Sequence, residues 1–253
     1  MVTGLDIFRK HFADFTDRYV LIGGAACDLV MAEAGLEFRV TKDLDIVLCI
    51  EALDADFARA FWSFVKRGEY EFQEKSTGEK QFYRFQKPQS NGFPAMLELF
   101  SRVPDVLSVS DESHLTPIPV DEAISSLSAI LLDEDYYCWI HTGKRLLQDL
   151  YAVGAERLIP LKAKAWLDLT ARKAAGGKID SKDIKKHKND VFRLFPLLTP
   201  EPIPEVPQII RDDLEQFLLA MGSEQVALKS LGCGERNKED ILASLRRIYG
   251  ISL

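Results

Sequence analysis

The chain has 253 residues, of which 47% are apolar and 28% charged, the balance of a globular protein with material for two small domains. No apolar run approaches the roughly 20 residues needed to cross a bilayer. The N-terminus also lacks a basic region followed by an apolar one, so we expect a cytoplasmic protein without membrane contact. Four widely spaced cysteines argue against a zinc site or a disulfide framework.

Charge is distributed unevenly along the chain. The net charge of -7 excludes a general affinity for nucleic acid. Residues 161–195, however, hold ten Lys and Arg against four Asp and Glu. This basic segment indicates a local surface for phosphates, with solvated helix faces as the alternative.

The first part of the chain predicts a mixed sheet with helices. Apolar runs and turn residues predict strands at 19–22, 43–50, 80–86, 94–100 and 146–153, and helical spacing predicts helices at 6–16, 25–34, 57–68 and 121–137. The loop with Pro88, Asn91 and Gly92 predicts that the strands on either side of it form a hairpin.

From Pro160 onward the pattern is helical. Pro160 suits the first helical position, and Ser181 suits an N-cap. The expected helices cover 161–174, 181–194, 208–221 and 238–249, with a proline-rich connector at 196–207. The chain is therefore predicted as an α+β protein, with a sheet-containing domain at 1–155 and an all-helical domain at 156–253.

The pair Gly23-Gly24 ends an apolar strand and begins a helix. Without side chains the backbone can approach a ligand closely, and the N–H groups of the new helix point toward it, an arrangement that suits a phosphate. A simple tight turn is the alternative interpretation.

Three carboxylates accompany these glycines. Asp43 and Asp45 are two residues apart on a predicted strand, so both point to one face, as in a cation site or a solvated edge strand. Glu98 interrupts the apolar strand at 95–100 and needs solvent or a positive partner. A metal shared by all three would supply that partner, and carboxylate oxygens suit Mg²⁺.

This combination resembles the DNA polymerase beta-like nucleotidyltransferase superfamily. The resemblance is carried by Gly23-Gly24, by Arg39-x-Thr41-x-Asp43-Leu44-Asp45 and by Glu98. It implies a strongly twisted mixed sheet flanked by helices. It also implies that the carboxylates bind Mg²⁺, or alternatively Mn²⁺, together with the triphosphate of an NTP substrate.

The Gly-to-Asp spacing and the later lysine-rich helices look most like the AbiEii/AbiGii toxin branch of that superfamily. By this resemblance Lys162, with Lys164 as competitor, and the helix carrying Asp183 and Lys186 complete the nucleotide site. The branch further implies a toxin of a toxin–antitoxin or phage-defence pair, restrained by a cognate antitoxin.

The sequence leaves the roles of several residues near the glycines and carboxylates open. Arg39 could contact a phosphate or hold Glu98, and Thr41 could only orient the loop before Asp43. Ala25 and Ala26 follow the glycines where many members of the superfamily have Ser or Thr, so phosphate contact there would depend on backbone N–H groups.

The favoured hypothesis is a Mg²⁺-dependent enzyme that moves an NMP from an NTP to an acceptor hydroxyl, with Asp43, Asp45 and Glu98 as catalytic residues. The expected acceptor is RNA, such as a tRNA end, bound through residues 161–195. Two rivals remain: a transferase that acts on a small molecule such as an antibiotic, and a nucleotide-binding module without catalysis.

Overall fold

In the computed structural model, residues 2–41, 43–48, 55–72, 81–101 and 133–252 are described. The chain forms two compact units. Unit 1 comprises Met1–Leu132 and Gly143–Gly154, and unit 2 comprises Asp133–Thr142 and Ala155–Leu253. The sequence prediction put 133–142 in the first domain. These residues belong to unit 2 because Tyr136 is buried there and donates a hydrogen bond of 3.0 Å to Asp213.

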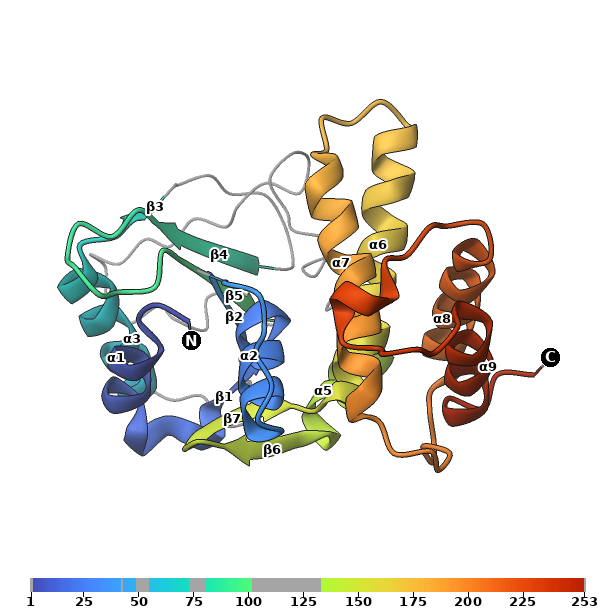
Figure 1. The fold of residues 1–253 in the computed structure, drawn as a ribbon. Helices are drawn as coiled ribbons and strands as arrows, with labels where there is room; N and C mark the ends of the chain where they lie inside the picture. Colours follow the sequence, from blue (N-terminus) through green and yellow to red (C-terminus); the bar gives the residue numbers. More distant parts are fainter. Residues whose placement is uncertain (1, 42, 49–54, 73–80, 102–132, 253) are drawn as a thin grey trace. The chain divides into compact units, whose positions relative to one another are not determined.

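Unit 1 is a mixed sheet with helices (Figure 1), which confirms the predicted α+β class. Its helices are α1 (Leu5–His11), α2 (Gly23–Glu33) and α3 (Ala55–Gly68), with a 3₁₀ helix η1 (Ala13–Arg18). Its strands are β1 (Tyr19–Ile22), β2 (Asp43–Leu48), β3 (Glu71–Phe72), β4 (Gln81–Gln86), β5 (Met96–Ser101), β6 (Lys144–Leu147) and β7 (Leu150–Val153). The strand order is β3-β4-β5-β2-β1-β7-β6. The pairs β2–β5 and β1–β7 are parallel, and the others are antiparallel.

Several predicted elements of unit 1 differ from the structure. The single strand expected at 146–153 is a hairpin of β6 and β7, because Gln148 and Asp149 both have positive φ, 47° and 61°, which reverses the chain. The helix expected over 6–16 ends at His11 and gives way to η1. The hairpin expected around residues 88–92 is confirmed as the antiparallel pair β4–β5. Residues 49–50, 80 and 121–132 of other predicted elements lie outside the described residues.

Aromatic side chains build the core on one face of this sheet. Phe57, Phe61 and Phe64 recur at helical spacing on α3 and are all buried. The ring of Phe12 packs on these three with centroid distances between 5.4 and 6.1 Å. Phe61 in turn lies 5.4 Å from Phe85 of β4, which ties α3 to the sheet.

Charged side chains of the central strands lie on the opposite face of the sheet. Leu44 pairs with Leu97, and both are fully buried. Because side chains alternate along a strand, their neighbours Asp45 and Glu98 point the opposite way. Asp45 pairs with Glu98, and Glu98 pairs with Arg84 of β4, so three charged residues follow one another across three strands.

Among the described residues of unit 2, the regular secondary structure consists of helices. It contains α5 (Glu134–Thr142), α6 (Ala155–Ala174), α7 (Ser181–Leu194), α8 (Gln208–Met221) and α9 (Lys238–Ile248), with 3₁₀ helices η3 (Phe195–Leu197) and η4 (Leu228–Leu231). The helices predicted at 181–194 and 208–221 are confirmed. None of the helices in the described part of the chain is long and apolar enough to span a membrane.

The start of one helix in unit 2 and the N-cap of another differ from the prediction. α6 begins at Ala155, so Pro160 lies inside the helix. Proline has no N–H for the carbonyl four residues earlier, that of Glu156. That carbonyl instead accepts a hydrogen bond of 2.8 Å from Tyr249 Oη. At α7 the N-cap is Asp180, whose side chain accepts from Lys182 N at 2.9 Å, and Ser181 is the first helical residue.

Candidate functional site

Gly23 lies directly against the carboxylate of Asp45. Gly23 follows Ile22, the residue of β1 that pairs with Asp45. Its φ is +66°, and a Cβ atom placed on it would lie 1.7 Å from Asp45 Oδ2. Only glycine fits that space and that conformation. The backbone at the start of α2 and a carboxylate of β2 therefore share one corner of unit 1.

Gly24 makes the matching contact with Thr41. A Cβ atom on Gly24 would lie 2.5 Å from Thr41 Oγ1. The two glycines thus contact two of the residues that the sequence analysis selected, Asp45 and Thr41. Thr41 also brings to this corner a hydroxyl group that the buried Ala25 and Ala26 do not supply.

The start of α2 suits an anion. Its N-cap residue is Ile22, which makes no side-chain capping hydrogen bond. The first N–H groups of a helix have no partner within the helix, and they carry the positive end of its dipole. Asp45 is only 8% exposed and Asp43, on the same face of β2, is half-buried. N–H donors and carboxylate oxygens therefore meet at one place.

Glu98 has a positive partner, Arg84. The carboxyl group of Glu98 is buried, and its Oε1 accepts hydrogen bonds from Arg84 Nε at 2.8 Å and from Arg84 Nη2. The sequence predicted either solvent or a positive partner for Glu98, with Arg39 as one candidate, and did not identify Arg84. The available signal was a single charged residue in the middle of the strand Gln81–Gln86, next in the hairpin to Glu98.

The side-chain atoms in this corner that could coordinate a metal ion are oxygens, the ligand type that Mg²⁺ prefers. Within the described ranges, no group of three or more His, Cys, Asp or Glu side chains could hold a metal ion. Asp43 and Asp45 fit such an ion by chemistry and by sharing a face, whereas Glu98 is paired with Arg84. Arg39 is half-buried in the loop before β2, with its guanidinium 5.1 Å from the ring of Phe38.

The lysines that the sequence analysis assigned to the nucleotide belong to unit 2. Lys162 is 2% exposed, and its Nζ lies 3.4 Å from Asp190 Oδ2. Its competitor Lys164 donates to Asp213 at 2.9 Å and lies 3.7 Å from Asp168. Burial alone would lower the pKa of Lys164, but the two carboxylates outweigh burial and raise it. Burial raises the pKa of Asp168, and the charge of Lys164 opposes that rise.

Other cations of the basic segment are also paired inside unit 2. Lys186 donates to Asp183 at 2.8 Å, one turn away on α7. Lys188 pairs with Glu224, and Arg193 with Asp190. With Lys162 and Lys164, five of the ten Lys and Arg in 161–195 thus have carboxylate partners.

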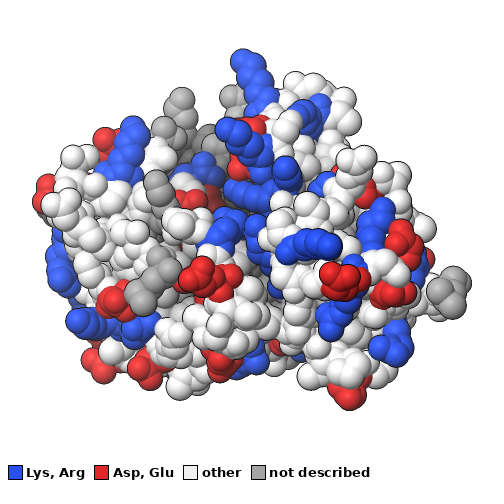
Figure 2. Space-filling view, viewed as in Figure 1, with Lys and Arg blue, Asp and Glu red and all other residues white. Residues whose placement is uncertain are grey.

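The remaining positive charge is concentrated where α6 turns into α7. Lys178, Lys182 and Lys185 are exposed there and have no carboxylate partner among the described residues. We call these three residues the hairpin tip. Blue side chains gather over this end of the two helices in Figure 2.

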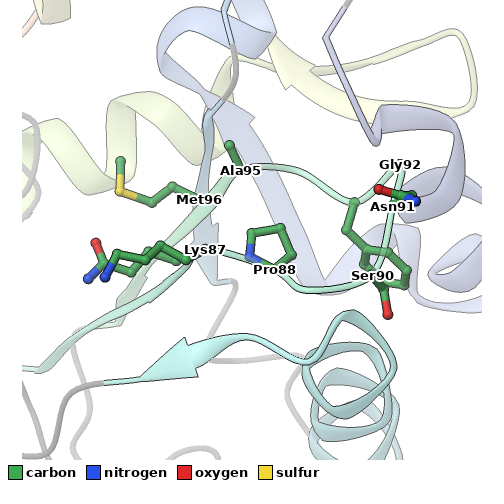
Figure 3. A pocket seen from close by; sticks show the side chains of 9 residues that line it. Lys87, Pro88, Ser90, Asn91, Gly92, Ala95 and Met96 are labelled. Atoms are coloured by element: carbon green, nitrogen blue, oxygen red, sulfur yellow. The ribbon is translucent and has the colours of Figure 1, made fainter.

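A shallow hollow of about 480 Å³ lies at the β4–β5 turn, between side chains from both arms (Figure 3). Its lining includes Lys87, Pro88, Asn91 and Met96 but no acid or histidine. It therefore lacks an acid–base pair and contains none of the predicted site residues.

Comparison with known proteins gives one structural likeness. No family model matches the chain, and no curated protein matches it. The structure is similar to the crystal structure of an antigenic nucleotidyltransferase-like protein from Paracoccidioides brasiliensis. The match has a TM-score of 0.42 and 12% sequence identity, and it covers 98% of this chain and 96% of that chain.

Proposed function

We propose that the chain is a divalent-metal-dependent nucleotidyltransferase, which transfers an NMP from an NTP to an acceptor hydroxyl. The observation that supports this most is the contact between Gly23 and Asp45. It brings a carboxylate to the start of α2, where the N-cap residue Ile22 makes no side-chain capping hydrogen bond, so metal and phosphate ligands would occupy one corner. A purely structural turn does not require a buried carboxylate at that point.

Asp43 and Asp45 are the proposed metal ligands, for Mg²⁺ or alternatively Mn²⁺. When bound, the ion neutralises the triphosphate and polarises the phosphorus that is attacked. The backbone N–H groups of Gly23 and Gly24 and the hydroxyl of Thr41 face the phosphates. Arg39 is a further proposed phosphate contact from the loop before β2.

Glu98 is proposed to accept the proton of the acceptor hydroxyl. Arg84 occupies Oε1, and no hydrogen bond among the described residues reaches Oε2. The acceptor oxygen then forms a bond to the α-phosphorus. The bond from that phosphorus to the oxygen bridging toward the β-phosphorus breaks, and pyrophosphate leaves with the electron pair.

RNA is the proposed acceptor, and the hairpin tip is its proposed contact, because unpaired lysines suit a phosphate backbone. A toxin role with a cognate antitoxin is the corresponding biological proposal.

The pairing of five other cations within unit 2 favours a second candidate for the acceptor, a small-molecule hydroxyl. The roles of Lys162, Asp183 and Lys186 in nucleotide binding stay predictions, since contact with a phosphate would compete with the ion pairs of both lysines.

The test is transfer of label from each α-labelled NTP, with Mg²⁺, to total cellular RNA or to a panel of hydroxylated small molecules. Asp45→Asn keeps the size of the side chain beside Gly23 but removes its charge. The matched control is Asp17→Asn, an exposed acid of unit 1. We expect label in an acceptor with the wild type and Asp17→Asn and a loss with Asp45→Asn. Equal labelling by Asp45→Asn would refute the site, and nucleotide binding without transfer to any acceptor would favour the non-catalytic alternative.

A further inference from the structure

Arg84 lies in a row of charged residues that crosses the sheet. It pairs with Glu98 on β5, and Glu98 pairs with Asp45 on β2. Directly paired residues share a face, and neighbouring strands lie about 4.8 Å apart, so two strand spacings separate Arg84 from Asp45. Its hydrogen bonds hold the guanidinium against the carboxylate of Glu98, one strand spacing nearer to Asp45 than the Arg84 backbone. Arg84 is therefore within reach of a ligand held at the Gly23–Asp45 corner.

The guanidinium of Arg84 is only partly used by its partner. Both of its hydrogen bonds, from Nε and Nη2, go to one oxygen of Glu98. A guanidinium has five N–H donors, so three remain. No other described residue accepts from Arg84, and its side chain is 23% exposed. The inner edge of the guanidinium, formed by Nε and Nη2, is thus fixed by Glu98. Its outer edge, which carries the remaining N–H groups, is open to a ligand.

Fixing the inner edge changes what Arg84 can bind. A free arginine loses side-chain entropy when it is ordered around a ligand. Glu98 has already ordered this one, because its side chain is only 6% exposed and accepts both hydrogen bonds from the guanidinium. The open donors form a planar fork, which matches the oxygens of a phosphate group.

We propose that Arg84 binds a phosphate group of the ligand and that Glu98 is its positioning residue. The identity of that ligand as an NTP rests on the proposed function. The contact itself requires only a polyphosphate. Glu98 then has two tasks, with Oε1 holding Arg84 and Oε2 remaining for the acceptor.

The test is isothermal titration of the full chain with tripolyphosphate, without divalent metal. Arg84→Gln should weaken binding by about tenfold or more, the value of a charge-assisted hydrogen bond. The affinity of Arg84→Lys should lie between those of the wild type and Arg84→Gln, because lysine keeps the charge but lacks the planar fork of N–H donors. The control is Arg145→Gln on β6, since Arg145 is also a strand arginine beside a glutamate, Glu33. It should bind like the wild type.

The double variant Arg84→Gln/Glu98→Gln guards against misfolding, because it leaves no buried charge unpaired. It should melt near the wild-type temperature and still bind weakly. Wild-type affinity in either Arg84→Gln protein, or no tripolyphosphate binding by the wild type, would overturn the inference. Dependence on Arg84 without nucleotidyl transfer would refute the proposed function alone. Transfer activity with binding indifferent to Arg84 would refute this inference alone.

Discussion

The carboxylate of Asp45 occupies the space that a side chain at residue 23 would need. A Cβ atom there would lie 1.7 Å from Oδ2, and φ at residue 23 is +66°. Both facts have one origin, since Ile22 ends β1 opposite Asp45 and the chain must turn at once into α2. The glycine is therefore needed both for the turn and for the approach of the carboxylate.

Gly23→Ala should destabilise the protein more than Gly35→Ala. Residue 35 also has a positive φ, +70°, but a Cβ atom there meets nothing within 4 Å. Gly35→Ala should thus cost only the left-handed backbone strain, about 1–2 kcal/mol. Gly23→Ala adds displacement of the Asp45 carboxylate, and we expect a total of about 3 kcal/mol or more. Urea unfolding measures both values. Equal losses would show that residue 23 is constrained by its φ alone.

Tyr249→Phe should destabilise unit 2 through the carbonyl of Glu156. Tyr249 is fully buried, and burial raises the pKa of its hydroxyl well above the usual range, so the group stays protonated and donates. Removal of the hydroxyl leaves the carbonyl without its side-chain donor, at a cost of about 1–3 kcal/mol.

Pro160→Ala provides the control for that interpretation. Alanine restores the N–H that the carbonyl of Glu156 lacks within α6. Tyr249→Phe should therefore cost less in a Pro160→Ala background than in the wild type. An unchanged cost in this double-mutant cycle would mean that Tyr249 acts by packing instead.

Lys162→Met should lower the free energy of unfolding by about 3 kcal/mol, because it removes the ammonium group that lies 3.4 Å from the buried carboxylate of Asp190. The comparison is Lys182→Met on the exposed face of α7, which should change stability by less than about 0.5 kcal/mol. Denaturant titration of both variants checks this expectation. Wild-type stability of Lys162→Met would argue that Lys162 is kept for a ligand instead of for folding.

Neutralising the hairpin tip should weaken RNA binding in a salt-dependent way. Lys178→Gln, Lys182→Gln and Lys185→Gln together should lower the slope of log affinity against log salt by about 2, at roughly 0.7 for each phosphate contact with a single strand. A control with three exposed cations elsewhere, Lys10→Gln, Lys66→Gln and Arg247→Gln, should leave the slope unchanged. If both triple variants lowered the slope equally, the tip would have no special role.

Local patterns were sufficient to predict much of this fold. The spacing of Phe57, Phe61 and Phe64 predicts α3, and the hairpin of β4 and β5 follows from its turn residues. The start of α6 could not be predicted in this way. A proline such as Pro160 normally occupies the first turn of a helix. It is tolerated inside α6 because Tyr249, 93 residues away in sequence, donates a hydrogen bond to the carbonyl of Glu156.

The candidate site was predictable in part for a similar reason. Alternation along β2 gives Asp43 and Asp45 a common face, whatever lies around them. The partner of Glu98 depends on which strand lies beside β5, and that register placed Arg84 there. The burial of Lys162 against Asp190 likewise depends on the packing of α6 against α7, which helical periodicity does not specify.

The central claim is that metal and nucleotide bind together at the start of α2. It is tested most directly by NMR of the labelled protein with Mn²⁺ and a non-hydrolysable NTP, which broadens backbone amide signals close to the ion. The signals of Gly23, Gly24 and Asp45 should broaden first, and Asp45→Asn should abolish the effect. Broadening centred on other residues, with these three signals unchanged, would contradict it.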